Sequence, residues 1–449
     1  MPLATQIASQ LRQALTEGRL AAGERLPASR ALATELGVSR TVVNGAYAQL
    51  FAEGWIEGRH GSGTYVAPGA PGTPAATVTK PGPVAADNPA SRYSPVTPAV
   101  IDLRPGIPWI AGIDRAAWRR AWRTAGLQPT PAPGPRGLAR LREALTGYLR
   151  RSRGVQCDSD EILVTHGIAG GLGLIAAALL RPGDRVGIEE PGYPVAREVL
   201  AASGARLVPC PVDADGLLIG ELPAGLKLIY TTPSHQYPLG GRLSVPRRWA
   251  LIAWARAHGA LIAEDDYDGE FRYDVTPLPA LYGLDPEVVI YLGSTTKICT
   301  PELRVGWLAA RPELVTRLAE TSGRLDACPA GPAQHAALAL LTGGDLERHV
   351  RRMRHEYTRR RSALTEAFAD GRAGQLLGDQ AGIHLVLPTR RDADEIAAAA
   401  GQRGVAVGTL TRFYCGPVTR SGLVIGYGGA TLADVARGGR ILHQILTGG

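Results

Sequence analysis

Residues 293–307 read GSTTKICTPELRVGW, and the lysine in this stretch is unusual for the chain. Of the 49 lysine and arginine residues, only Lys80, Lys227 and Lys297 are lysines. A lysine, unlike an arginine, can lose its proton and attack a carbonyl group to form an imine. Lys297 lies among small and hydroxyl-bearing residues and is therefore a candidate Schiff-base lysine. The alternative is an ordinary surface lysine.

The stretch belongs to a longer alternation of apolar, strand-like runs and helical segments that begins at residue 101. The runs are EILVTHG (161–167), DRVGIEEP (184–191), ARLVPCPV (205–212), LKLIYTTP (226–233), ALIAEDDYD (260–268), VVIYLGSTTK (288–297) and RVGWLAA (304–310). Because they are apolar throughout and their connections are long enough for crossover helices, they predict buried strands of an α/β sheet, mixed or parallel. Ligands of such sheets bind beyond the strand ends.

Each run ends in glycine or polar residues. Gly167, Ile168 and Ala169 form a strand-to-helix turn whose backbone N–H groups could hold a phosphate, although tight helix packing explains the glycines equally well. Tyr193 follows the next run and could stack on a flat ligand. Asp265 belongs to a cluster of carboxylates at the end of another run, which could contribute to a ligand site. The alternative is a solvated acidic loop.

Composition sets wide limits. The 449 residues can form two or three domains, and 45% hydrophobic with 20% charged residues is ordinary for a soluble protein. No run of 18 apolar residues and no signal peptide is present, so we expect a cytoplasmic protein without a membrane span. The five cysteines lack CxxC spacing, so we expect neither disulfides nor a metal site.

Residues 1–67 predict three helices followed by a hairpin, the order of a winged helix-turn-helix domain. An apolar stripe marks the first helix, Gly37 ends the second, Ser39 caps the third, and WIEGRHGSGTYV (55–66) forms the hairpin. The third helix would enter the major groove of DNA with its N-terminal residues leading. These residues are Ser39, Arg40, Thr41 and Asn44. A small protein-binding module is the alternative.

A Pro-, Ala- and Gly-rich segment without periodicity, residues 68–97, predicts a semi-extended linker to the domain of residues 98–449. The basic helical stretch DLERHVRRMRHEYTRRRSAL (345–364) is read as a solvated face in preference to a track for DNA, and it is left unassigned.

The stretch from residue 18 to residue 66 resembles the DNA-binding domain of the GntR family over nearly its whole length. The resemblance implies that the head contacts double-stranded operator DNA. By the resemblance, the DNA contacts are Arg30, Ser39, Arg40 and Thr41, with His60 and Gly61 in the wing. Asn44 departs from the arginine often found there, which alters the operator base expected at that position.

Residues 100–449 resemble the fold-type I aminotransferases, which use pyridoxal 5′-phosphate (PLP). The resemblance implies that Lys297 forms the Schiff base, Asp265 holds the pyridine nitrogen, Tyr267 bonds the ring hydroxyl and Tyr193 stacks on the ring. Ser294 and Arg304 are then phosphate ligands, together with the turn at Gly167, Ile168 and Ala169. His235, or Gln236, would lie near the ring hydroxyl.

The head, linker and body together resemble the MocR subfamily of GntR-type regulators, whose motifs include TPSHQYPLG (232–240) and EDDYDGEFRY (264–273). This implies a homodimeric transcriptional regulator that senses PLP, alone or with a small amine, as vitamin B6-sensing members do. Ala132 and Val195 depart from residues of related enzymes, and only Arg412 or Arg420 could clamp a substrate carboxylate. The rival hypotheses are an active aminotransferase carrying a DNA-binding domain, and a scaffold that has lost its cofactor.

Overall fold

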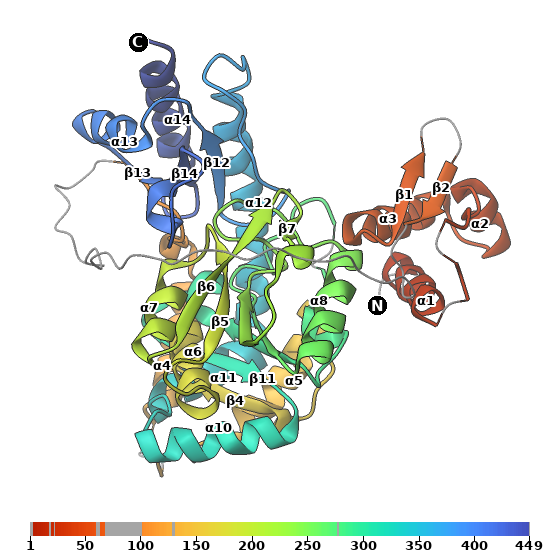
Figure 1. Cartoon of the computed structure of the whole chain (residues 1–449), viewed down its shortest axis with the longest axis vertical. Coiled ribbons are helices and arrows are strands. Elements are labelled where there is room, and N and C mark those ends of the chain that lie inside the picture. Colours follow the sequence, from red (N-terminus) through yellow and green to blue (C-terminus); the bar gives the residue numbers. More distant parts are fainter. Residues whose placement is uncertain are drawn as a thin grey trace.

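The computed structural model describes residues 3–17, 19–21, 23–59, 63–67, 101–127, 131–275 and 278–448. A small N-terminal head stands beside a larger body (Figure 1). The predicted linker, residues 68–97, lies outside the described residues, as do His60 and Gly61 of the predicted wing.

The head has the helices and the hairpin that its sequence predicts. Ser39 caps the third helix by accepting a hydrogen bond from the Val42 amide, and Gly54 ends that helix with a φ of 79°. The antiparallel hairpin follows directly. The elements are α1 (Leu3–Thr16), α2 (Ser29–Glu35), α3 (Arg40–Glu53), β1 (Ile56–Arg59) and β2 (Gly63–Val66).

The body is built on an eight-stranded mixed sheet in the order β4-β11-β10-β9-β8-β5-β6-β7. All seven predicted runs are strands of this sheet, which confirms the α/β prediction. Neighbours from β10 to β6 are parallel, whereas β11 runs antiparallel to both β10 and β4. The strands are β4 (Ile162–Thr165), β5 (Arg185–Glu190), β6 (Arg206–Asp213), β7 (Gly216–Leu217), β8 (Leu226–Thr231), β9 (Leu261–Asp265), β10 (Val289–Ser294) and β11 (Gly306–Ala309).

Helices cover both faces of this sheet because its strands are apolar on both sides. One face packs against α6 (Gly167–Leu179), α7 (Pro194–Ala202) and α10 (Pro312–Leu325). The other packs against α4 (Arg115–Ala125), α5 (Ala139–Arg153), α8 (Val245–His258), α11 (Gly331–Thr342) and α12 (Asp345–Glu366). Short connecting elements are α9 (Thr295–Ile298), η1 (Ile110–Gly112), η2 (Ser159–Glu161), η3 (Ile219–Glu221), η4 (Leu281–Gly283), η5 (Pro301–Leu303) and η6 (Leu410–Phe413).

A second, four-stranded sheet was not anticipated from the sequence. Its order is β12-β14-β13-β3, and it joins the first strand of the body to the C-terminal segment. Its elements are β3 (Ile101–Leu103), β12 (His384–Pro388), β13 (Val405–Thr409), β14 (Gly422–Gly426), α13 (Ala393–Gln402) and α14 (Leu432–Thr447). Figure 1 shows this smaller lobe above the large sheet.

The basic helix α12 is balanced by acidic partners. The exposed arginines Arg348 and Arg359 pair with Asp345 and Glu356, and Glu347 pairs with Arg151 of α5. These pairs favour the solvated-face interpretation. In the described part of the chain, no helix combines the length and the apolar character that crossing a bilayer requires.

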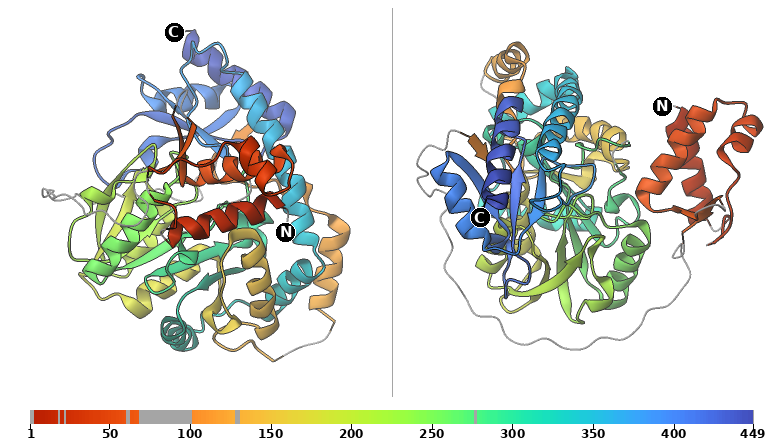
Figure 2. Two further views of the ribbon diagram at one scale, coloured as in Figure 1. Left: turned by 90° about the vertical axis from the view of Figure 1, so that its right-hand side faces the viewer. Right: turned by 90° about the horizontal axis from the view of Figure 1, so that it is seen from above.

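The head contacts the body at the first turn of α8. Val245, which is 6% exposed, belongs to the same hydrophobic cluster as Trp55 and Leu50 of the head. A cavity of about 20 Å³ lies between Trp55 and Glu53 on one side and Arg248 on the other. Figure 2 shows the head in front of the body in the left view and to one side of it in the right view. A helix of the large domain therefore completes part of the core of the small one.

We expect Arg153→Ala to lower the free energy of unfolding of the body by about 3–5 kcal/mol, since it leaves the carboxylate of Asp266 buried without its guanidinium partner. Urea unfolding followed by circular dichroism measures this loss. The matched control is Arg151→Ala, which breaks the exposed pair with Glu347 and should cost less than about 1 kcal/mol. Equal losses in the two variants would contradict the assignment.

Candidate functional site

Asp265 is the last residue of β9, and only one of its two carboxylate oxygens accepts a hydrogen bond from a described residue. Its Oδ2 accepts a hydrogen bond from the Tyr230 hydroxyl on β8. Its Oδ1 is buried and has no hydrogen-bond partner among the described residues. Burial raises the pKa of Asp265 to about 8, and the charges of Asp266 and Asp268 act in the same direction. The site therefore holds an acceptor that is suited to a buried N–H donor.

The acidic cluster after β9 is not a solvated loop, so that alternative was wrong. Asp266 is 4% exposed, and its carboxylate faces the guanidinium of Arg153 at the end of α5 in a two-point ion pair. Tyr291 donates a hydrogen bond of 2.8 Å to the same carboxylate. Arg153 and Tyr230 are site residues that the sequence analysis missed. Only the position of Tyr230, two residues before the TPSHQYPLG motif, could have indicated it.

Lys297 lies in the one-turn helix α9 directly after β10. Ser294 caps that helix, and its hydroxyl accepts a hydrogen bond from the Thr296 amide. The ammonium group of Lys297 donates a hydrogen bond to the carbonyl of Gly106. Burial lowers the pKa of Lys297, while the carboxylates of Asp268 and Asp265 oppose that shift. A lowered pKa makes the neutral, nucleophilic amine more accessible.

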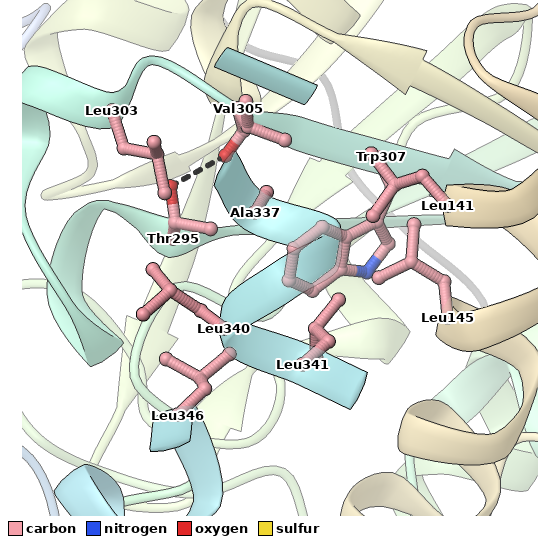
Figure 3. A pocket seen from close by; sticks show the side chains of 10 residues that line it. All are labelled: Leu141, Leu145, Thr295, Leu303, Val305, Trp307, Ala337, Leu340, Leu341 and Leu346. Carbon is pink, nitrogen blue, oxygen red and sulfur yellow. Dashed lines mark hydrogen bonds between the residues drawn. The ribbon is translucent and has the colours of Figure 1, made fainter. Parts of the chain in front are cut away.

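The turn that carries Lys297 rests on a tightly packed apolar layer. Thr295 donates a hydrogen bond of 2.8 Å to the Val305 carbonyl, which ties the turn to the start of β11 (Figure 3). The cavity beneath it measures about 10 Å³, too small for any ligand larger than a water molecule. It is lined by Leu141, Leu145, Thr295, Leu303, Val305, Trp307, Ala337, Leu340, Leu341 and Leu346. The lysine is therefore held by a rigid support.

Aromatic rings surround this region edge to face. The ring of Tyr237 lies 5.6 Å from Tyr193, 5.4 Å from Tyr267 and 5.3 Å from Phe413 between centroids. The structure thus brings the predicted residues Tyr193 and Tyr267 together through Tyr237. The sequence analysis quoted the motif around Tyr237 but assigned it no role.

His235, one of the two residues expected near the ring hydroxyl of the cofactor, lies beside Tyr267. The Tyr267 hydroxyl is 2.8 Å from Nδ1 of His235, and a carboxylate oxygen of Asp268 is 3.0 Å from the same nitrogen. Gln236 points elsewhere and donates hydrogen bonds to Glu189 and to the carbonyls of Pro191 and Tyr237. Of the two candidates left open by the sequence, His235 is the one in contact with the tyrosine.

The residues expected at the phosphate group come from three separate segments. Gly167, Ile168 and Ala169 form the first turn of α6, and the φ of 69° at Gly167 favours glycine. Gly306 lies so close to the backbone of Gly167 that a side chain at position 306 would clash with it. This contact places the N-terminus of α6 against Gly306, the first residue of β11. Arg304 is exposed, with a φ of 53°.

The structure separates the two arginines considered for a carboxylate clamp. Both are exposed, but the charge of Arg412 acts on Tyr237, whereas that of Arg420 acts on Asp213 on β6. Arg412 is therefore the one near the aromatic cluster. Val195 lies in the first turn of α7 and supplies no charge.

The predicted DNA contacts within the described residues share the exposed side of the head. Ser39, Arg40, Thr41 and Asn44 lie at the N-terminal end of α3, and all four are exposed, as is Arg30 of α2. The guanidinium of Arg40 reaches the Ser29 hydroxyl at 3.4 Å. Among the described residues this end of α3 is exposed, so it can enter a groove.

Cofactor-free Asp265→Asn should show a weaker pH dependence of stability than the wild type. Because the folded-state pKa of Asp265 is raised to about 8, its contribution to the free energy of unfolding falls as pH rises from about 4 to about 8. Asparagine cannot ionise and removes this contribution. Urea unfolding at several pH values tests it, with exposed Asp326→Asn as the control. Identical pH slopes in wild type and Asp265→Asn would refute the burial argument.

Comparisons with known proteins agree with the two-part architecture. Residues 3–66 match the gntR family of bacterial regulatory proteins, and residues 118–432 match aminotransferase class I and II. The crystal structure of Pyrococcus horikoshii kynurenine aminotransferase superimposes with a TM-score of 0.71 at 25% identity, covering 78% of this chain and 92% of that one.

Full-length relatives combine both parts. The chain is 37% identical over 424 residues to the HTH-type pyridoxine biosynthesis transcriptional regulator PdxR of Corynebacterium glutamicum, covering 94% of this chain and 91% of that protein. It is 35% identical to the probable rhizopine catabolism regulatory protein MocR of Rhizobium meliloti, covering 96% of this chain and 90% of that protein. The chain therefore belongs to the MocR subfamily of GntR-family transcriptional regulators, which join a DNA-binding helix-turn-helix head to an aminotransferase-like domain.

Proposed function

We propose that this DNA-binding regulator holds PLP covalently at Lys297 and that occupancy of the pocket changes the affinity of the head for its operator. The observation that carries the proposal is the buried Oδ1 of Asp265, which has no hydrogen-bond partner among the described residues and lies in the lobe that also holds Lys297. A carboxylate in such a position needs a donor, and a protonated pyridine nitrogen is one.

The residues present fit that cofactor. Asp265 would accept the ring N–H, Tyr267 would bond the ring hydroxyl with His235 behind it, and Tyr193 would cover the ring face. The phosphate would be held by Ser294, Arg304 and the backbone of Gly167, Ile168 and Ala169. When bound, PLP supplies an aldehyde for the amine of Lys297 and a ring that accepts electrons.

A short series of contacts supports communication between pocket and head. Arg248 on α8 donates hydrogen bonds to the carbonyls of Pro233 and Leu243, which flank the loop that contains His235. It also bonds the carbonyl of Pro279, 2.9 Å away. Val245, three residues before Arg248 on α8, is packed into the core of the head. A shift of the loop on cofactor binding would therefore reach the head through one helix turn.

The sensor interpretation is favoured over the enzyme interpretation by the weak provision for a substrate carboxylate. Val195 carries no charge, Arg420 faces Asp213, and Arg412 is exposed. We infer that PLP, alone or with a small amine, is the effector, in line with the name of the Corynebacterium relative. We further propose a cytoplasmic homodimer, because operators with two half-sites require two heads.

Adding PLP to the cofactor-free protein should change operator affinity several-fold, which corresponds to about 1–3 kcal/mol of coupling. Fluorescence anisotropy with labelled operator DNA measures this. Lys297→Arg keeps the positive charge but cannot form the covalent bond, so its affinity should not respond to PLP. Val245→Ala, which trims the contact between head and body and leaves the pocket untouched, should bind PLP but show a smaller response.

An unchanged operator affinity with and without PLP, combined with brisk multiple-turnover transamination, would overturn the sensor proposal in favour of the enzyme.

Arg40→Ala should weaken operator binding by about 1–3 kcal/mol and relax base preference at one position if Arg40 reads a base. If it contacts only phosphate, the loss should be similar on all sequences and the salt dependence should become shallower. Arg19→Ala, an exposed arginine of the head that pairs with Glu17, is the control and should bind as the wild type does. Wild-type affinity and salt dependence in Arg40→Ala would remove Arg40 from the DNA contacts.

A further inference from the structure

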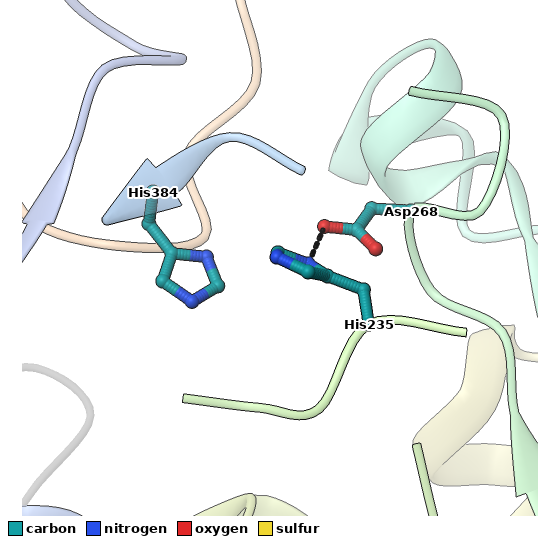
Figure 4. Close-up of side chains that lie close together, drawn as sticks. All are labelled: His235, Asp268 and His384. Carbon is teal, nitrogen blue, oxygen red and sulfur yellow. Dashed lines mark hydrogen bonds and ion pairs between the residues drawn. The ribbon is translucent and has the colours of Figure 1, made fainter. Parts of the chain in front are cut away.

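Two buried histidines lie side by side next to the proposed cofactor pocket. Among the described residues, only one ring nitrogen of each has a hydrogen-bond partner. His235 follows β8 in the loop of the large sheet, and His384 is the first residue of β12 in the smaller sheet. They are 2% and 1% exposed, and their ring centroids lie 5.1 Å apart. Figure 4 shows both rings with Asp268, and a nitrogen of each ring is turned toward the other.

One nitrogen of each ring is anchored. Nε2 of His384 lies 2.8 Å from the carbonyl oxygen of Pro238, which can only accept, so this nitrogen carries the proton. Nδ1 of His235 lies 3.0 Å from a carboxylate oxygen of Asp268 and 2.8 Å from the Tyr267 hydroxyl, and since the carboxylate can only accept, this nitrogen carries the proton. The opposite nitrogens, Nδ1 of His384 and Nε2 of His235, are left with lone pairs.

These two nitrogens are buried and have no hydrogen-bond partner in the described ranges of the chain, and they do not bond each other. Burial lowers the pKa of His384 to about 3, and the charges of His235 and Lys297 add to this effect. His384 therefore stays neutral at physiological pH, so its Nδ1 keeps a free lone pair. Because a buried polar atom without a partner is costly, two facing lone pairs favour binding of a group that accepts electron pairs.

The arrangement has the pattern of a metal site. Histidine ligands of metals nearly always donate their other ring N–H to a carboxylate or a backbone carbonyl, which fixes the ring and its tautomer. His235 and His384 each satisfy this condition, with Asp268 and Pro238 respectively. One ring nitrogen of each histidine and a carboxylate oxygen of Asp268 lie within 4.8 Å of one another.

We infer that His235 and His384 form a binding site for a divalent transition-metal ion of the zinc type, for which imidazole is a preferred ligand. Asp268 orients His235, its carboxylate offsets part of the positive charge, and the remaining coordination positions stay open to water or a small ligand. The expectation of no metal site rested on the cysteine spacing; His235, Asp268 and His384 are far apart in the chain and follow no ligand spacing. The inference does not depend on the proposed function.

The test uses the tag-free, full-length protein with PLP removed, since PLP itself binds metals, and with metals stripped by a chelator. Titration with Zn²⁺ by calorimetry and metal analysis after gel filtration should give about one ion per chain. His384→Gln, which retains a donor for the Pro238 carbonyl, and His235→Ala should lose this ion. Asp268→Asn should weaken binding by about 10- to 100-fold.

Exposed His355→Ala is the matched control and should bind as the wild type does. The inference is overturned if the wild type binds no Zn²⁺, or if His384→Gln and His235→Ala, shown to be folded by circular dichroism, still bind one ion.

Discussion

The buried ion pair between Arg153 and Asp266 is the interaction on which the site depends. Arg153 is the last residue of α5, and besides Asp266 its guanidinium bonds the hydroxyl of Ser234 and the carbonyl of Gly269. It therefore joins the loop after β8 to the loop after β9. A side chain at position 269 would overlap both partners of the pair, so glycine is required there.

Arg153 forms its ion pair with Asp266, and among the described residues the neighbouring buried carboxyl groups have no such direct partner. Burial raises the pKa of Asp265 to about 8 and those of Glu264 and Glu270 to about 7, and Asp266 adds repulsion to each. Glu264 is satisfied by the amides of Leu281 and Tyr282, and Glu270 by the hydroxyl of Tyr148. Asp265 alone of these three has a buried oxygen without a partner among the described residues. Of these three carboxyl groups, Asp265 is therefore the one that can accept a further hydrogen bond at a buried oxygen.

The sequence predicted the parts of the structure that repeat a local pattern. The apolar runs specify the large sheet, the capping residues Ser39 and Gly54 specify α3, and the strand-end positions direct attention to Asp265, Tyr267 and Lys297. The smaller sheet escaped prediction because its strands are only three to five residues long and are formed by distant segments. No local signal could pair Arg153 with Asp266, His235 with His384, or Val245 with the head, since these contacts exist only in the folded chain.

The central claim is that Lys297 and Asp265 hold PLP in this pocket, and trapping the bound cofactor tests it most directly. Cofactor-free protein is mixed with PLP, reduced with borohydride, digested and mapped by mass spectrometry. The account predicts a pyridoxyl group on Lys297, no trapped group in Lys297→Arg, and much weaker trapping in Asp265→Asn. A pyridoxyl group on Lys80 or Lys227, or none on Lys297, would contradict it.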